Sequence, residues 1–417
     1  MATIQERLVE FNSWWKETFT LEFRPRKVYG EMRKFHKQPQ IVALTGLRRV
    51  GKSTLLKKIV QDEIAAGRDP KAIMYFSFDE FKDTEPSEIL KAYNEITGKD
   101  ASKEKTILLF DEVQKVTDWE NKIKTIYDLY KGKAKIYISG SESLFVKTKA
   151  KETLAGRIFY FKVETLSFIE YLDFKQKKFE PTALYQKELF KEFKEFIQSQ
   201  GFPELVNVTD REIIQKYIQE GIVEKIVYRD IPTIYAIKET SVLESLLKLL
   251  MEEPGQIIDM QTLASQFKTT RQTISNYFSF LEQAFLIRKL YNYSPNKRKV
   301  ERKLKKYYSA ILSPSLTFKE DTISQSKVLE CVVANNLNAE FFWRDQYKNE
   351  VDIILTEPAL IPIEVKLSET KSKSLELFMQ KFKAKKGYII TQNQEIKEKG
   401  KVEVMPAFKY FLVRQTK

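Results

Sequence analysis

A phosphate-binding loop is indicated by the glycines and the lysine that follow the apolar run 41–44. Gly46, Gly51 and Lys52 fit the spacing G-x-x-x-x-G-K-[ST], which Ser53 completes. Glycines at these positions let the backbone wrap closely, so that successive N–H groups point at phosphate oxygens. A helix that begins near Lys52 adds the positive end of its dipole. The segment predicts a nucleotide site, with Lys52 at the β- and γ-phosphates and the Ser53 hydroxyl on Mg²⁺.

Two arginines inside this loop extend the predicted contact. Arg48 and Arg49 could meet phosphate, nucleic acid or a neighbouring subunit. A chance glycine turn is the alternative, but an apolar strand pattern precedes the motif and a helical pattern follows it. The residues expected to contact ATP are Gly46, Arg48, Arg49, Gly51, Lys52, Ser53 and Thr54.

A pair of carboxylates, Asp111 and Glu112, follows a second apolar run at 107–110. Ligands of open α/β sheets lie at the carboxyl ends of the strands. We expect Asp111 to hold Mg²⁺, directly or through water, and Glu112 to orient and deprotonate the attacking water. An Asp-Glu pair at the end of a strand is weak evidence alone, but after a phosphate-binding loop at this separation it is strong.

A third strand pattern, KIYISGSES, ends in Ser139 and Ser141. These hydroxyls lie where a group that senses the γ-phosphate would be expected. A polar turn between a strand and a helix is the alternative.

Short apolar runs alternate with longer amphipathic stretches from residue 41 to about residue 161. This alternation is typical of a parallel sheet covered by helices on both faces. Residues 166–240 have a helical pattern almost throughout, 241–310 form a compact helical region, and the remainder is mixed. We therefore predict an α/β protein whose length corresponds to several domains.

The composition excludes several classes of site. The chain of 417 residues has one cysteine, Cys331, and one histidine, His36, so an internal disulfide framework and Cys- or His-cluster metal sites are excluded. We expect Cys331 to be a core thiol and His36 to be structural. The net charge of +14 leaves a polyanion open as a partner. No secretory signal or membrane-spanning stretch is evident, which indicates a cytoplasmic protein without a membrane partner.

Five linked motifs resemble the prokaryotic AAA-type ATPases that carry a C-terminal domain of unknown function. They are TGLRRVGKSTLL, LLFDEVQKVTDWE, ISGSESLF, LAGRIFYFKVETLSFIEYL and GFPEL, and the resemblance runs over essentially the whole chain. It implies an AAA-like core at 1–165, a helical lid at 166–240, a winged helix at 241–310 and a nuclease-like domain at 311–417. It also makes Arg157 the candidate arginine finger or sensor arginine, with an ion-paired surface arginine as the alternative.

Residues 241–293 have the order helix, turn, short helix, turn, longer helix and strand. Thr269 and Thr270 precede the third helix and could cap it. In a helix-turn-helix arrangement this helix would present polar side chains to a DNA groove and apolar ones inward. The polar side chains are Arg271, Gln272, Ser275 and Asn276, and the apolar ones are Ile274, Phe278 and Leu281.

A basic run flanked by tyrosines follows, in YNYSPNKRKVERKLKKYY. Such a run suits phosphate contacts at a wing. We expect Arg271, Lys303, Lys305 and Lys306 to contact nucleic acid. The alternatives are a solvated charged face and a module that binds protein.

The segment NEVDIILTEPALIPIEVKLS carries the second chemically pointed pattern. Asp352 begins one apolar strand, and Glu364 and Lys366, two residues apart on the next, share a strand face. Glu330 on a preceding helix could add a fourth charged group. The pattern resembles the metal-dependent PD-(D/E)xK nuclease core, although the literal Pro-Asp is absent.

Two clustered carboxylates repel each other, so Mg²⁺ bound by Asp352 and Glu364, with Lys366 beside it, is the expected resolution. An inactive nuclease-like fold that binds DNA or a partner keeps much of the same pattern.

Two functions follow. The first is an ATPase that couples nucleotide binding to DNA binding or processing. The second is a nucleotide-switched scaffold whose winged helix and inactive tail bind protein partners. The sequence leaves a homo-oligomer open.

Overall fold

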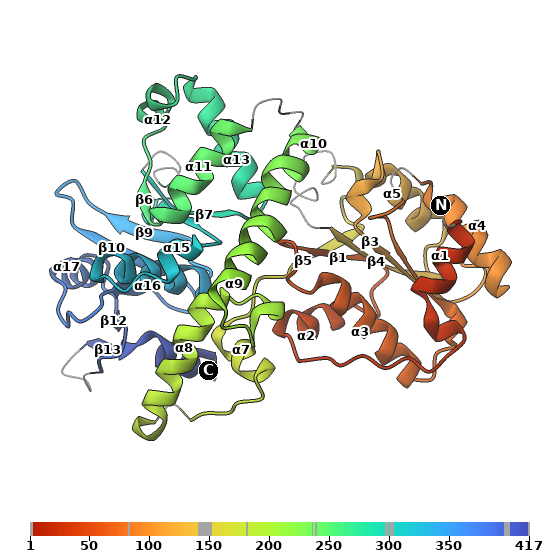
Figure 1. Ribbon diagram of the computed structural model, residues 1–417, viewed down its shortest axis with the longest axis horizontal. Coiled ribbons are helices and arrows are strands. Elements are labelled where there is room, and N and C mark those ends of the chain that lie inside the picture. Colours follow the sequence, from red (N-terminus) through yellow and green to blue (C-terminus); the bar gives the residue numbers. More distant parts are fainter. Residues whose placement is uncertain are drawn as a thin grey trace. The chain divides into compact units, whose positions relative to one another are not determined.

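The computed structural model describes residues 3–81, 84–140, 152–180, 182–235, 237, 240–296, 300, 304–395 and 401–415. The chain forms two compact units, Met1–Glu164 and Thr165–Lys417. Figure 1 labels most of their elements. Two residues named in the sequence analysis, Ser141 and Lys303, lie outside the described residues.

A parallel sheet forms the centre of the first unit. Within the described residues it has five strands in the order β2-β3-β4-β1-β5, and every neighbouring pair is parallel. The strands are β1 (Ile41–Thr45), β2 (Ile73–Ser77), β3 (Thr106–Asp111), β4 (Ala134–Gly140) and β5 (Ile158–Lys162). Because a sheet covered on both faces buries all its side chains, β1 and β3 are continuous buried runs. The predicted α/β class is confirmed.

Helices cover both faces of this sheet. They are α1 (Ile4–Phe11), α2 (Lys27–Arg33), α3 (Lys52–Ala65), α4 (Pro86–Thr97) and α5 (Trp119–Leu129). Apolar side chains of α1, α4 and α5 pack on one face, and α2 and α3 contact strands of the same sheet. Local signals set the helix ends: a capping box joins Thr3 to Glu6 at the start of α1, and left-handed Gly98 ends α4.

The second unit begins with helices and ends with a large sheet. The helices up to residue 283 are α7 (Phe168–Phe174), α8 (Gln186–Ser199), α9 (Arg211–Ile218), α10 (Ile231–Tyr235), α11 (Ser241–Glu252), α12 (Met260–Gln266) and α13 (Arg271–Gln283). Two π-helical turns, Gln219–Val223 and Ile226–Asp230, lie between α9 and α10. Later helices are α15 (Pro314–Thr317), α16 (Thr322–Asn336), α17 (Lys373–Phe382) and α18 (Ala407–Gln415).

Eight strands of the described residues form the sheet of this unit, in the order β13-β12-β11-β10-β9-β7-β8-β6. They are β6 (Gln256–Ile257), β7 (Ile287–Asn292), β8 (Lys305–Ser309), β9 (Phe341–Arg344), β10 (Glu350–Leu355), β11 (Ile361–Val365), β12 (Gly387–Thr391) and β13 (Val402–Pro406). The parallel pairing of Tyr291 with Phe341 joins β7 to β9. The lid, winged-helix and nuclease-like segments expected from the sequence therefore lie in one compact unit.

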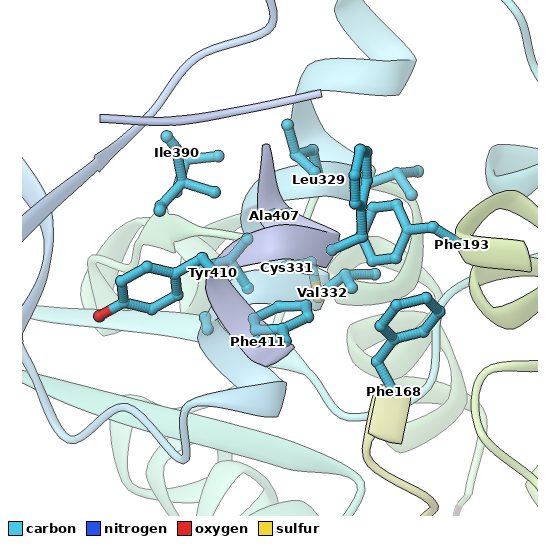
Figure 2. Packing of buried hydrophobic residues seen from close by; sticks show 14 of the residues in the cluster. Phe168, Phe193, Leu329, Cys331, Val332, Ile390, Ala407, Tyr410 and Phe411 are labelled. Carbon is cyan, nitrogen blue, oxygen red and sulfur yellow. The ribbon is translucent and has the colours of Figure 1, made fainter. Parts of the chain in front are cut away.

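Apolar side chains of distant segments form the core of the second unit (Figure 2). Phe168 and Phe193 come from α7 and α8, Val332 from α16, and Phe411 from α18. Cys331 is fully buried in this cluster as a free thiol, and burial raises its pKa. A second cluster, with Phe378 of α17, packs on the sheet as well.

Candidate functional site

The loop between β1 and α3 has the backbone that its glycines predict. Gly46 has φ +147°, and a Cβ there would lie 2.2 Å from the carbonyl oxygen of Val163. Gly51 has φ +94° and caps α3, so the helix begins at Lys52 with its N–H groups facing the loop. The sequence therefore needs glycine at residue 46 for space and at residue 51 for conformation.

Lys52 lies within this loop rather than on the surface. Its side chain is 5% exposed, and its Nζ donates hydrogen bonds to the carbonyl oxygens of Gly46 (3.2 Å) and Leu47 (2.8 Å). An ammonium at this position can bind an anionic phosphate, because charge-assisted hydrogen bonds are stronger than those to neutral carbonyl oxygens. Of the other predicted contacts, Arg48 is half-buried, and Arg49 and Thr54 are exposed.

Asp111 lies at the carboxyl end of β3, 2% exposed and surrounded by donors. The Tyr75 hydroxyl donates to Oδ2 (2.7 Å), the Ser139 hydroxyl donates to Oδ1, and the Glu112 N–H also donates to Oδ1 (3.1 Å). Since β4 lies between β3 and β1, Ser139 connects the carboxylate strand to the strand that carries the loop. Ser53 also lies close enough to the Tyr75 hydroxyl to lower its pKa, so both predicted Mg²⁺ ligands lie near one hydroxyl.

Glu112 follows in a left-handed backbone conformation, with φ +56°. Burial raises the pKa of Glu112, and the positive charge of Lys52 partly opposes that rise. A raised pKa moves a carboxylate towards the range in which it can accept a proton near neutral pH. The side-chain amide of Gln114 donates a hydrogen bond to a carboxylate oxygen of Glu112. This geometry suits a general base beside the phosphate loop.

Two positioning residues of this site were not found from the sequence. Arg26, 8% exposed, donates to the carbonyl oxygens of Val50 (3.0 Å) and Glu164 (2.8 Å), which ties the loop to the end of β5. Asn12 pairs with both backbone groups of Tyr75, at 2.8 and 2.7 Å, along the free edge of β2. No local pattern identifies either contact, because each joins segments far apart in the sequence.

Gly46→Ala tests the shape of the loop. Because its methyl group would overlap the Val163 carbonyl, we expect the Tm to fall by several degrees, corresponding to about 2 kcal/mol, and ATP affinity to fall about tenfold or more. Gly67→Ala is the matched control, since Gly67 also has positive φ, +87°, but no atom within 4 Å. Thermal melting and nucleotide titration measure both. Equal losses in the two variants would contradict a specific role for Gly46.

Arg157 is not brought to the phosphate loop of its own chain. It immediately precedes β5, and its carbonyl accepts the N–H of Ile41 at the start of β1, the end of the sheet opposite the loop. Its guanidinium pairs with Asp128 at 2.9 Å. The expected role as a sensor within the chain is therefore wrong, since five-residue β1 separates Arg157 from the loop. A role as a finger towards another chain stays a prediction.

The polar face predicted for α13 is exposed. Arg271, Gln272, Ser275 and Asn276 are exposed, whereas Ile274, Phe278 and Leu281 are buried. Thr270 caps the helix by accepting the N–H of Thr273 at 3.1 Å. Strands β7 and β8 form an antiparallel hairpin after this helix, and β6 pairs with β8.

Lys306 does not lie on a nucleic-acid surface. It is 3% exposed, so its predicted contact with nucleic acid is wrong. Alternate residues of β8 face opposite sides of the sheet, and the basic run in the sequence conceals this alternation. Lys305 is half-buried, with its ammonium 5.8 Å from the ring centre of Tyr291.

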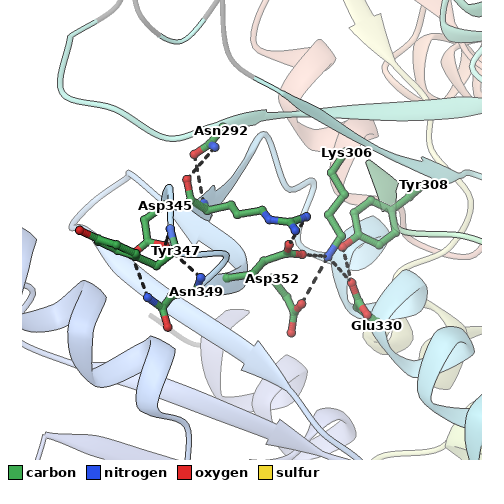
Figure 3. Close-up of polar contacts among 10 residues, drawn as sticks. Asn292, Lys306, Tyr308, Glu330, Asp345, Tyr347, Asn349 and Asp352 are labelled. Carbon is green, nitrogen blue, oxygen red and sulfur yellow. Dashed lines mark hydrogen bonds and ion pairs between the residues drawn. The ribbon is translucent and has the colours of Figure 1, made fainter. Parts of the chain in front are cut away.

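The Lys306 ammonium instead lies among carboxylates of α16 and β10 (Figure 3). Its Nζ donates hydrogen bonds to carboxylate oxygens of Glu330 (2.7 Å), Glu350 (2.8 Å) and Asp352 (3.3 Å). The Tyr308 hydroxyl also donates to Glu330, at 2.6 Å. Burial lowers the pKa of Lys306, but the negative charges of Glu330 and the other carboxylates outweigh burial, and the pKa is raised.

Asp352 and Glu364 lie close together, as the sequence pattern requires. Asp352 Oδ2 accepts the N–H of Val365, the residue after Glu364, at 2.9 Å. Burial raises the pKa of Glu364 to about 8, and the negative charge of Asp352 contributes to that rise. Burial also raises the pKa of Asp352, to about 6.

Glu364 also has an oxygen without a partner. Lys366 Nζ lies 3.2 Å from Glu364 Oε1, whereas Oε2 is buried and has no hydrogen-bond partner among the described residues. Within the described part of the chain, no three His, Cys, Asp or Glu side chains are grouped to hold a metal ion. Two carboxylates suffice for Mg²⁺, which usually keeps several waters.

Three residues of this cluster were not predicted as site residues. Glu350 could have been found, because it lies two residues before Asp352 on one strand. Tyr308 and Gly255 carry no such signal. A Cβ at Gly255 would lie 3.0 Å from the Tyr308 ring and 3.1 Å from Glu330 Oε1, so this glycine lets the chain pass close to the cluster.

Family models match three parts of the chain. Residues 38–172 match an AAA domain, residues 190–310 a domain of unknown function (DUF8612), and residues 326–410 another domain of unknown function (DUF4143). Residues 38–172 are therefore similar to an AAA domain. This part of the predicted resemblance is confirmed.

Relatives align over most of the chain. Two uncharacterized proteins of Methanocaldococcus jannaschii are each 28% identical; one alignment covers 90% of this chain and 85% of the relative, the other 89% and 88%. An uncharacterized protein of Haemophilus influenzae is 29% identical over 61% of this chain and 62% of its own length.

Solved structures are similar at a lower level. AMPPCP-bound DnaA from Aquifex aeolicus is 13% identical with a TM-score of 0.30, covering 63% of this chain and 89% of that one. Domain III of the replication initiation protein DnaA from Thermotoga maritima is 16% identical with a TM-score of 0.31, covering 50% and 93%. No helix among the described residues is long and apolar enough to cross a membrane.

Proposed function

We propose that this protein binds and hydrolyses ATP with Mg²⁺ and couples its nucleotide state to DNA binding. The observation that best supports hydrolysis is the bond from Ser139 on β4 to Asp111 on β3. It joins the carboxylate of β3 to β4, which is the neighbour of β1, the strand that precedes the phosphate loop. In this proposal Lys52 and the first turn of α3 bind the phosphates, and Ser53 and Asp111 hold Mg²⁺, which neutralises charge on the phosphates when bound.

Glu112 would act as the general base. Its carboxylate orients the attacking water and accepts a proton from it, while Lys52 remains on the phosphates. Burial keeps the pKa of Glu112 raised, so that the side chain is a better base than an exposed glutamate. Arg26 and Asn12 act indirectly, by holding the loop and Tyr75 in place.

The exposed face of α13 is the proposed DNA-binding surface, within a winged-helix arrangement of α11, α12, α13, β6, β7 and β8. Arg271 and Asn276 on this face can reach phosphates or base edges, and the net charge of +14 favours a polyanion. The basic run that precedes β8 in the sequence stays a predicted phosphate contact on the basis of its composition.

A salt titration tests this surface. Arg271→Gln is expected to weaken DNA binding several-fold and to reduce the slope of log K against log salt by about one, because one phosphate contact is lost. Lys216→Gln on α9 is the control, since it also removes one positive charge from an exposed side chain. ATP with Mg²⁺ is expected to shift the affinity of the wild type but not that of Lys52→Ala. Absence of salt-dependent DNA binding would favour a protein partner.

A metal-dependent nuclease site in the C-terminal region is a second candidate. The unpartnered, buried oxygen of Glu364 favours it, because a cation would satisfy that atom. Asp352 and Glu364 would hold Mg²⁺, with Lys366 stabilising charge on a phosphodiester. Cleavage of DNA that requires Mg²⁺ and disappears in Lys366→Ala would support this function.

A further inference from the structure

The acidic cluster of the second unit already contains a cation, the ammonium of Lys306. Its Nζ lies within 3.3 Å of Glu330, Glu350 and Asp352, which come from α16 and β10. An ammonium group has three donors, and three carboxylates surround this one. Buried charges are retained in proteins when they are paired in this way. The positive charge of Lys306 and the negative charges of the three carboxylates therefore stabilise one another in this cluster.

The oxygens that Lys306 occupies include those that a metal ion would need. Asp352 is a predicted metal ligand and Glu330 a predicted auxiliary one, and each is bonded through one oxygen to Nζ. Asp352 Oδ2 is also engaged, by the N–H of Val365. A divalent cation at Asp352 Oδ1 would bind at about 2.1 Å, and would face the ammonium 3.3 Å from the same oxygen. Two cations that share one carboxylate oxygen in a buried site repel each other strongly.

We propose that Lys306 is the resident cation of this cluster and competes with a divalent cation for Asp352 and Glu330. The site then takes a divalent cation with high affinity only when the Lys306 ammonium is displaced. This inference rests on the proposed metal-dependent site and adds its regulation. Lys306 belongs to β8, which begins at Lys305.

Mn²⁺ binding to the full-length protein without nucleotide tests the proposal, by calorimetry and by thermal melting with Mn²⁺ or EDTA. Lys306→Met is expected to bind Mn²⁺ at least about tenfold more tightly than the wild type, with a larger increase in Tm. Adding Asp352→Asn to Lys306→Met should abolish this gain, which assigns the ion to the cluster. Lys289→Met is the control, since Lys289 on β7 pairs with Glu282 and not with the cluster.

Where Lys306→Met does not fold without metal, the double variant Lys306→Met with Glu350→Gln removes one negative charge and retains Asp352, Glu330 and Glu364. It is expected to show the same Asp352-dependent gain, and folding that Mn²⁺ restores would also support competition.

Two outcomes overturn the proposal and have different meanings. If the wild type binds Mn²⁺ through Asp352 as tightly as Lys306→Met, the metal site exists but Lys306 does not compete for it. If neither the wild type nor the Lys306 variants bind Mn²⁺ through Asp352, there is no metal site, and the nuclease proposal fails with this one.

Discussion

Glu112→Gln is expected to bind ATP with wild-type affinity and to hydrolyse it at least about 100-fold more slowly, because an amide of the same size cannot accept a proton from water. Lys52→Ala is expected to lose affinity for ATP, since the Lys52 ammonium is a buried cation in the phosphate loop. Binding of a fluorescent ATP analogue and release of phosphate separate the two effects. Loss of turnover with retained affinity in Glu112→Gln, together with loss of affinity in Lys52→Ala, would support the two separate roles.

The control for Glu112→Gln is Glu104→Gln. Glu104 precedes β3 and pairs with Lys99, so it lies at the opposite end of the strand from Glu112. Its substitution should leave both affinity and turnover unchanged. The wild-type rate is also expected to rise with pH through the raised pKa of Glu112, as the carboxyl group loses its proton. Equal rates for wild type and Glu112→Gln would remove Glu112 from the mechanism.

We expect the effect of Glu364→Gln on the free energy of unfolding to be more stabilising at pH 9 than at pH 5, by about 2–3 kcal/mol in EDTA. Burial raises the pKa of Glu364 from 4.5 to about 8, so the folded state binds more protons than the unfolded state between these values. Stability contributed by this residue is therefore present at low pH and lost as pH rises through that window. Glutamine carries no proton equilibrium and should not show the loss.

Comparing the two pH values cancels any effect of the substitution on stability that does not depend on pH. A change in packing caused by the substitution acts at both pH values, whereas the desolvation of the charged carboxylate and its ion pair with Lys366 matter only at the higher pH, where Glu364 has lost its proton. Glu403→Gln on β13 is the control, because Glu403 pairs with Lys386 and is 19% exposed. Denaturant melts at pH 5 and pH 9 measure the effect. An identical pH dependence in wild type and Glu364→Gln would show that Glu364 is not buried as a charged group.

Bound Mn²⁺ or Mg²⁺ would reverse this expectation at high pH, since a cation stabilises the charged carboxylate. The same melts with metal in place of EDTA therefore connect the pH effect to the proposed metal site. In the wild type, Lys306 would keep that reversal small.

The shape of the phosphate loop and the position of Asp111 at the end of β3 follow from local sequence. Gly46, Gly51 and Lys52 lie within seven residues of each other, and Asp111 directly follows an apolar run, so their arrangement depends on local geometry. The same holds for α13, whose exposed and buried faces follow the helical period. Local spacing fixes such features because one helix or strand positions all of their side chains.

The position and partners of Lys306 depend on tertiary packing. In the sequence it is one of several lysines in a basic run, and its partners Glu330, Glu350 and Asp352 are 24, 44 and 46 residues away. Charge pattern alone favours a solvated face for such a residue. The pairing of β7 with β9 joins the hairpin to the C-terminal strands in one sheet.

The same reason explains the other residues that sequence reasoning missed or misplaced. Tyr75 meets Asp111, and Arg26 meets Val50, only because separate strands and loops are brought together. Arg157 lies at the wrong end of β5 for its own phosphate loop, and strand direction in the sheet is set by pairing rather than by residue type. Contacts between elements that are distant in sequence depend on this packing, which no local pattern encodes.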